Sequence, residues 1–341
     1  MYSLSDMVVR DNGLQGERTL FIILYLCRNE KNKDGSVIDP DMTSEVLIHG
    51  KEKDGKIASP VSKLMAKGMK VNVVYNYSDA VDELMSGRYR ECFVACSPGD
   101  GKLPTEDGGT IEFENDDLKR FINCLEVFVS HGGNIMFMLR NYPYTFEAEV
   151  YFKTYYNIDV VSKKSIPGGM IMNKEQDMEK FKADVPGTFV HVCKDPMNNE
   201  MPLPIGSGIV AMYEGRDLAA LNESALVNNE KGQFDVFARE HEGNAAIMIS
   251  YGDDKRGRII IDAAASKLFG DFGEEGVPNW ISNSAAFLLN QERYYTDECD
   301  ITQVPTTLDM PKSVNLLEHD VQIECREPRN WTNEEFCDSY E

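Results

Sequence analysis

Short apolar runs alternate along this chain with amphipathic stretches and polar turns. Stretches whose apolar residues recur every three or four positions predict helices at 59–67, 78–87, 115–130 and 146–157. Between them, continuous apolar runs predict buried strands at 19–26, 71–75, 92–96 and 135–139. This alternation predicts an α/β fold: a flavodoxin-like, doubly wound, mostly parallel sheet with helices on both faces.

The clearest unit of this pattern is a strand at 92–96 that is followed by a helix and a second strand. A long loop at 97–112, rich in Gly, Pro, Asp and Thr, separates the first strand from the helix at 115–130. The apolar run at 135–139 has the composition of a strand that is covered on both faces. Together these segments form one β-α-β crossover of a parallel sheet.

Both ends of the helix in this unit carry recognisable signals. Asn115, Asp116 and Asp117 predict its N-cap and first turn, because side-chain oxygens and negative charge stabilise that end of a helix. Gly132 and Gly133 predict its end, since glycine adopts the left-handed conformation at little cost. At 59–67 and 78–87 we likewise expect helices, the second one capped by its first serine and closed by a glycine.

The second half of the chain is less regular. Three successive strands, the first two forming a hairpin, and then a helix are predicted at 234–239, 245–251, 258–262 and 278–290. They would complete the same sheet and pack onto it.

These elements suggest one α/β domain over residues 1–292, with an irregular insertion or edge at 165–217 that holds possible strands at 189–193 and 208–213. Residues 293–341 are acidic, contain three prolines and lack a regular apolar pattern, so we expect an extended C-terminal tail. If such a tail is ordered, it must lie either on its own globular body or on a neighbouring subunit.

The net charge of the chain limits the classes of partner that it is expected to bind. The sequence has 57 acidic and 35 basic residues, for a net charge of −22. Such a surface repels nucleic acid and anionic membranes, whose binding needs clustered Lys and Arg. Basic partners or divalent cations suit it better. No apolar run approaches the length of a membrane span, and no secretory signal is apparent.

The eight cysteines are scattered and form no CxxC pairs. A chain of 341 residues can build a large core without disulfides. Reduced thiols, and therefore a cytoplasmic location, are expected.

The carboxyl end of the strand at 92–96 is where open α/β sheets place ligands. Cys96 stands there and is a candidate nucleophile, with His131 or His191 as its base. However, no glycine lies two residues before Cys96, so the glycine-flanked nucleophile turn of hydrolases is missing. Cysteine on a buried strand is more often a packing residue, and we expect no catalytic site at Cys96 or its neighbour Asp100.

The loop after this strand is acidic. Asp100, Glu106 and Asp107 would repel phosphate, but their oxygens could bind a divalent cation. Because the loop lacks EF-hand ligand spacing, a solvated acidic loop is the favoured interpretation. A second acidic stretch at 33–45 has a misplaced glycine for a calcium loop, and the five histidines show no zinc-binding spacing. Neither a metal nor another cofactor is predicted.

Two segments resemble a known family. The stretch 89–95 followed by 121–138, in which a helix ends in Gly-Gly before a strand, resembles the class I glutamine amidotransferase-like superfamily. Its non-amidotransferase branches, the ThuA-like proteins and the domain of intraflagellar and gliding proteins, are the most similar. The closing segments 257–262 and 279–285 are similar to the last strand and helix of such domains. The resemblance implies an α/β domain over 19–290, and the catalytic motif of amidotransferases has no counterpart here.

Three functions remain open at this point. The first is a non-enzymatic α/β binding or assembly subunit that binds a protein partner, or a second copy of itself, through its C-terminal tail. The second is a hydrolase or an enzyme of sugar metabolism that uses the loops at the strand ends. The third is an acidic protein that responds to Ca²⁺. Because no catalytic signature is present, the first is preferred.

Overall fold

A computed structural model gives the structure of the chain. In its most regular parts it describes residues 16–25, 56–105, 109–139, 144–156, 245–250, 255–262, 277–289 and 307–321. It further describes Gly252, residue 323 and the short stretches 47–48, 51–53, 166–170, 194–195, 198–202, 213–218, 234–239 and 265–268.

A seven-stranded sheet forms the centre of the molecule, in the order β13-β14-β15-β8-β5-β1-β4. Its strands are β1 (Arg18–Ile23), β4 (Lys70–Val74), β5 (Glu91–Ala95), β8 (Asn134–Met138), β13 (Phe234–Arg239), β14 (Ala245–Ser250) and β15 (Ile259–Asp262). The pairs from β15 to β4 are all parallel, whereas β14 is antiparallel to both of its neighbours.

The order of the parallel strands is the flavodoxin-like one. The five parallel strands are, in chain order, β1, β4, β5, β8 and β15. Across the sheet they lie in the order β4-β1-β5-β8-β15, which is 2-1-3-4-5 when they are numbered along the chain. The strand order therefore reverses between β1 and β5, where sheets of this kind bind their ligands. This confirms the α/β fold class expected from the sequence.

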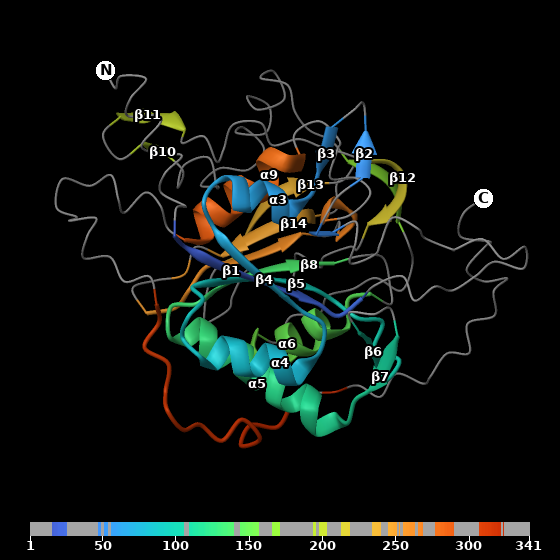
Figure 1. Cartoon of the computed structure of the whole chain (residues 1–341), viewed down its shortest axis with the longest axis vertical. Coiled ribbons are helices and arrows are strands. Elements are labelled where there is room, and N and C mark those ends of the chain that lie inside the picture. The colour runs from blue at the N-terminus through green and yellow to red at the C-terminus, as the bar shows by residue number, and fades with distance from the viewer. Residues whose placement is uncertain are drawn as a thin grey trace, which may run out of the picture.

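Helices cover both faces of the sheet (Figure 1). Helices α3 (Pro60–Ala66) and α9 (Val277–Leu288) contact each other on one face. On the other face, α5 (Asn115–Ser130) lies between α4 (Tyr77–Met85) and α6 (Phe146–Tyr156). The core fills both interlayer spaces; Phe137 of β8, for example, contacts Tyr151 of α6 with ring centroids 5.3 Å apart.

Two helix starts differ from the sequence prediction. Helix α4 is capped by Asn76, whose side-chain oxygen accepts a hydrogen bond from the Asp79 N–H at 2.9 Å, and not by Ser78. The earlier start brings the ring of Tyr77 onto Phe121, with centroids 5.0 Å apart. The cap residue of α5 is Glu114 and not Asn115, although acidic residues do occupy the first turn as predicted.

The prediction of a long loop at 97–112 is wrong in part, because this segment contains a small hairpin. Strands β6 (Lys102–Pro104) and β7 (Thr110–Glu112) pair antiparallel, with Leu103 opposite Ile111. Leu103 and Pro104 of β6 are buried and anchor the hairpin, whereas β7 is exposed; loop composition alone does not predict this anchoring.

The remaining described elements are short. Two-stranded ribbons are formed by β2 (Lys51–Lys53) with β3 (Lys56–Ala58), by β9 (Ile166–Met170) with β12 (Tyr213–Leu218), and by β10 (Lys194–Asp195) with β11 (Asn198–Pro202); a 3₁₀ turn, η3, spans Ala265–Leu268. The last two ribbons give regular pairing to parts of the predicted irregular insertion. The strand predicted at 189–193 lies outside the described residues, and the one at 208–213 does so except for Tyr213, the first residue of β12.

A C-terminal segment, residues 307–321, lies against the body of its own chain along α4 and α5, and we call it the strap. It runs without helix or strand along the outer side of these helices (Figure 1). Met310, Leu316 and Val321 of the strap are buried. An ordered tail was expected to lie either on its own globular body or on a neighbouring subunit. This part of the tail lies on its own globular body.

Candidate functional site

The carboxyl ends of β1 and β5, where the strand order reverses, carry a closed cluster of polar side chains. Glu147, at the start of α6, lies fully buried between Ser97 and Tyr77. Its Oε1 accepts hydrogen bonds from the Tyr77 and Ser97 hydroxyls, both at 2.6 Å, and its Oε2 accepts from the Ser97 N–H at 2.7 Å. The carboxylate thus links α4, α6 and the loop after β5.

The titration of this cluster follows from its burial. Removal from water raises the pKa of Glu147, while hydrogen bonds from Ser97 and Tyr77 lower it in part. Burial, and then the nearby Glu147 charge, raise the pKa of Tyr77 well above its usual value. Tyr77 is therefore a hydrogen-bond donor throughout the physiological pH range.

The loop that leaves β5 is packed tightly over this cluster. The Gly99 N–H donates to the Ser97 Oγ at 3.1 Å, so the hydroxyl both donates and accepts. A Cβ atom at Gly99, whose φ is +69°, would lie 2.5 Å from the ring of Phe146. Beside it, Tyr25 after β1 and Tyr144 before α6 are in ring contact, with centroids 4.2 Å apart. In this arrangement the hydrogen-bonding groups of Ser97 and Glu147 serve to join chain segments.

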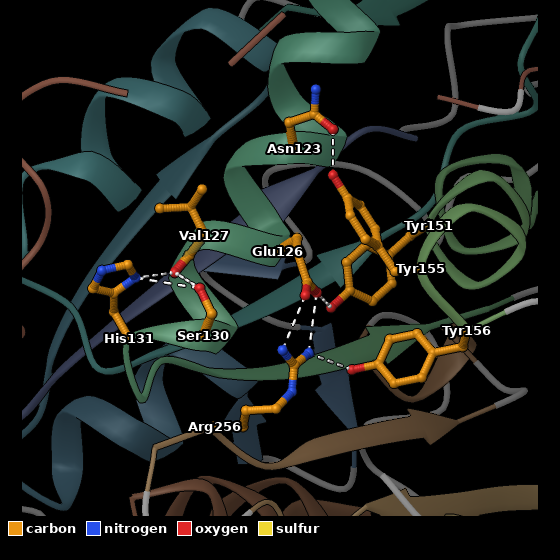
Figure 2. A network of polar contacts seen from close by, with 9 residues as sticks. All are labelled: Asn123, Glu126, Val127, Ser130, His131, Tyr151, Tyr155, Tyr156 and Arg256. Carbon is orange, nitrogen blue, oxygen red and sulfur yellow. Dashed lines mark hydrogen bonds and ion pairs between the residues drawn. The ribbon is translucent and has the colours of Figure 1, made fainter. Parts of the chain in front are cut away.

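The candidate catalytic residues of the sequence are not brought together. Cys96 is 2% exposed at the end of β5. His131 follows α5, at the opposite end of the sheet, where its Nδ1 lies 2.8 Å from the Val127 carbonyl oxygen and 3.3 Å from the Ser130 Oγ (Figure 2). Asp100 is exposed on the loop, and its Oδ1 accepts from the Lys102 N–H.

Other sequence candidates lie outside the described residues, namely His191, Glu106 and Asp107. Among the residues that are described, no group of three metal-ligating side chains is found. The described helices also include none that is long and apolar enough to cross a membrane. The thiols of Cys92 and Cys124 are buried, and burial raises the pKa of the Cys124 thiol to about 12, so it is unreactive at neutral pH.

A second buried carboxyl group lies at the amino end of β5. Glu91 is fully buried beside Thr19, with which it is in register on β1. Close by, Arg90 Nη1 and Glu17 Oε1 form a buried ion pair at 3.4 Å. Burial is the main cause that raises the pKa of Glu91 well above its usual value; the Thr19 hydroxyl lowers it and the Glu17 charge raises it further.

This gives the protein an expected pH dependence. Between the unfolded pKa of about 4.5 and the raised folded pKa, Glu91 binds a proton only in the folded state. Its stabilising contribution is complete below pH 4.5 and is lost as the pH rises toward the folded pKa. The Glu91→Gln variant cannot ionise there, so wild-type stability should fall relative to it by up to about 1.4 kcal/mol per pH unit.

Urea unfolding of both proteins from pH 4.5 to 8 would measure this difference. A difference that stays constant over that range would show that Glu91 has an ordinary pKa in the folded protein.

The strap is held by backbone contacts as well as by apolar ones. The Leu308 N–H donates to the Gly87 carbonyl oxygen at 2.8 Å. The Asn123 side-chain amide of α5 donates to the Leu316 and His319 carbonyl oxygens, at 2.6 and 3.1 Å. A Cβ atom at Gly87 would lie 2.4 Å from the Leu308 oxygen, so glycine is needed where the strap passes the end of α4.

Asn123 is itself held in place by a polar network that joins α5 to α6 (Figure 2). Its Oδ1 accepts a hydrogen bond from the Tyr155 hydroxyl, which leaves the Asn123 amide group directed at the strap. One turn further along α5, Glu126 forms a two-pronged ion pair with Arg256 at 2.9 and 3.1 Å. Arg256 also donates to the Tyr156 hydroxyl at 2.8 Å. The network fixes both helices, so the surface under the strap is preorganised.

Sequence reasoning missed both Glu147 and Asn123. Glu147 lies one turn before Val150 and Tyr151 of α6, whereas Asn123 lies opposite the apolar stripe of α5, on the side that the strap covers; both are buried. For Glu147 the available signal was a charged residue among apolar ones, since buried polar groups need partners, whereas the helical pattern of α5 gives Asn123 an ordinary polar position. The identity of those partners, 32 to 196 residues away in the chain, is not visible in the sequence.

No protein-family model and no curated protein matches this chain. Among solved structures, it is similar to one titled "mmIFT52 N-terminal domain", with 9% identity over 83% of this chain and 99% of the other, at a TM-score of 0.39. It is similar also to "Cytoplasmic Protein STM3548 from Salmonella typhimurium", with 11% identity over 79% and 98% of the two chains, at a TM-score of 0.38. Both similarities concern the fold alone.

Proposed function

We propose that this protein is a non-enzymatic α/β binding or assembly module, in which the α4–α5 face binds an extended polypeptide segment. The observation that carries this proposal is the strap, which this face already holds. An extended segment is bound there by Asn123, by the carbonyl of Gly87 and by burial of apolar side chains.

The chemistry of this face suits peptide binding. An extended segment exposes its own backbone polar groups, so a surface that binds it must supply hydrogen-bond partners. The Asn123 amide has two donors and serves two carbonyls of the strap. The buried side chains of Met310, Leu316 and Val321 supply the apolar contribution, about 1.5 kcal/mol or more for a fully buried side chain.

The cluster at the strand ends supports a non-enzymatic role. A catalytic nucleophile or base must reach its substrate. Ser97 and Glu147 are instead fully buried, and each hydrogen-bonds to other parts of the chain. The cytoplasmic location suggested by the scattered thiols belongs to the same proposal.

A peptide-binding measurement tests this function. In the full-length double variant Met310→Asp/Leu316→Asp, two charges in place of buried apolar side chains should release the strap and free the α4–α5 face. A labelled peptide of residues 307–321 should then bind with a Kd on the order of 0.01–0.1 mM, since the apolar contacts must exceed an association cost of several kcal/mol. Fluorescence anisotropy would measure it.

The matched control adds Asn123→Asp to the same chain. The aspartate keeps the oxygen that accepts from Tyr155 but has no N–H groups for the strap, so affinity should fall at least tenfold. Equal binding to both chains, or no binding to either while circular dichroism shows both folded, would contradict the proposal.

A further inference from the structure

We propose that the strap can be exchanged between two copies of this chain, so that residues 307–321 of each copy bind the α4–α5 face of the other. The proposal rests on the binding function proposed above and names its partner, a second copy of the same chain. Exchange of an identical element between protomers is a known route to dimers, because every contact already exists in the monomer.

The path of the chain is the first argument. Helix α9, the last helix or strand that the structure describes before the strap, packs against α3 on one face of the sheet. The strap lies on the opposite side of the molecule, along α4 and α5 (Figure 1). Between Leu288 and the strap the sequence has 18 residues, 289 to 306. The strap is therefore a terminal element joined to its docking face by a long connection.

The length of this connection permits exchange. Fully extended, 18 residues span at most about 60 Å. A folded domain of this length has a radius of gyration of about 20 Å, so the docking face of an adjacent copy is within reach.

The contacts of the strap are the second argument. Among the described residues, Asn123 and Gly87 form hydrogen bonds with it and Lys119 lies 3.8 Å from Asp320, and none of these body residues adjoins the strap in sequence. The bonds within the strap, from the Leu317 N–H to Asn315 Oδ1 and from the Glu318 N–H to the Asn315 oxygen, are local turns that move with it. Every anchor can consequently be supplied by another copy with the same geometry.

Mass action decides which arrangement is populated. A connection of this length gives the chain's own strap an effective concentration of about 1 mM at the docking face. At micromolar protein the wild-type chain therefore binds its own strap, and exchange is expected when docking within one copy is blocked or the protein is concentrated.

Two full-length variants that complement each other test the exchange. The first carries Asn123→Asp, which impairs its docking face but leaves its strap intact. The second carries Met310→Asp/Leu316→Asp, which impairs its strap but leaves its docking face intact. Docking of the chain's own strap is blocked in the second variant and weakened about tenfold in the first, so mixing them at about 0.2 mM, above the expected Kd, should convert a substantial part of both into a species of twice the monomer mass by light scattering. Each variant alone should remain a monomer.

The outcomes separate this proposal from the one on which it rests. A mixed dimer that disappears when excess free peptide 307–321 is added supports exchange. If the second variant binds the free peptide but the mixture stays monomeric, the exchange proposal is overturned while the binding function stands. If it binds neither the peptide nor the first variant, both proposals fail. A dimer formed by either variant alone would overturn the exchange proposal, because it would not need a complementary strap.

Discussion

The Glu147→Ala variant should lose about 3–5 kcal/mol of unfolding free energy. Removing the carboxylate leaves three buried donors without an acceptor: the hydroxyls of Tyr77 and Ser97 and the Ser97 N–H. An unsatisfied buried donor costs about 1–3 kcal/mol, and partial relaxation of the loop should recover some of the sum. Urea unfolding monitored by fluorescence would measure the loss.

Smaller changes in the same cluster are the controls. Tyr77→Phe and Ser97→Ala each remove one partner but leave Glu147 hydrogen-bonded to the other, so each should cost about 1–2 kcal/mol. Because both hydroxyls donate to the same Oε1, their effects should not be additive. A loss below about 1 kcal/mol for Glu147→Ala would mean that this cluster does not hold the loop and the helices together.

The Gly257→Ala variant should be destabilised by roughly 3 kcal/mol or more, at the upper end of overpacking effects. A Cβ atom there would lie 1.7 Å from the Gly133 carbonyl oxygen, so the backbone of one turn must move. Movement would strain the Gly257 N–H bond to the Val129 oxygen at 2.8 Å. It would also disturb the nearby bond from the Arg258 N–H to Asn134 Oδ1, at 2.7 Å. Thermal or urea unfolding would show the effect.

The matched control is Gly101→Ala. Gly101 has a φ of +82°, but a Cβ atom there would meet nothing within 4 Å. Its substitution should cost about 1 kcal/mol, from backbone conformation alone. Equal losses for the two variants would contradict a steric origin at Gly257.

The parallel sheet could be predicted from the sequence because each of its strands is a short apolar run bounded by turn residues. Continuous apolar runs predicted β1, β5 and β8, which are buried in the structure. The pair Gly132-Gly133 correctly predicted the end of α5, and Gly132 has a φ of +87°. Positions that depend on contacts between distant segments could not be predicted. The cap of α4 moved to Asn76 because the ring of Tyr77 packs against Phe121, on another helix.

The functional residues were less predictable for a related reason. Cys96 was considered as a nucleophile because it lies at the end of a strand, and the structure places it there. The polar side chains at that strand end, however, are those of the next residue, Ser97, and of Glu147 on α6. The tail at 293–341 was expected to lie on the body or on a neighbour. Its acidic composition gave no means to choose, because the strap is held by backbone groups, which every sequence has, and by a few scattered apolar side chains.

The order in which a ribosome makes these parts has a consequence for the strap. The docking residue Asn123 is synthesised almost 200 residues before Leu316, with which it bonds. Arg256, the last residue of the network that fixes this face, is made 60 residues before Leu316, so at 5–20 residues per second the α4–α5 face is complete but uncovered for roughly 3–12 s during translation. Nascent chains on one polysome would then expose vacant faces close to finished straps, so pairing between copies has its best opportunity before release from the ribosome.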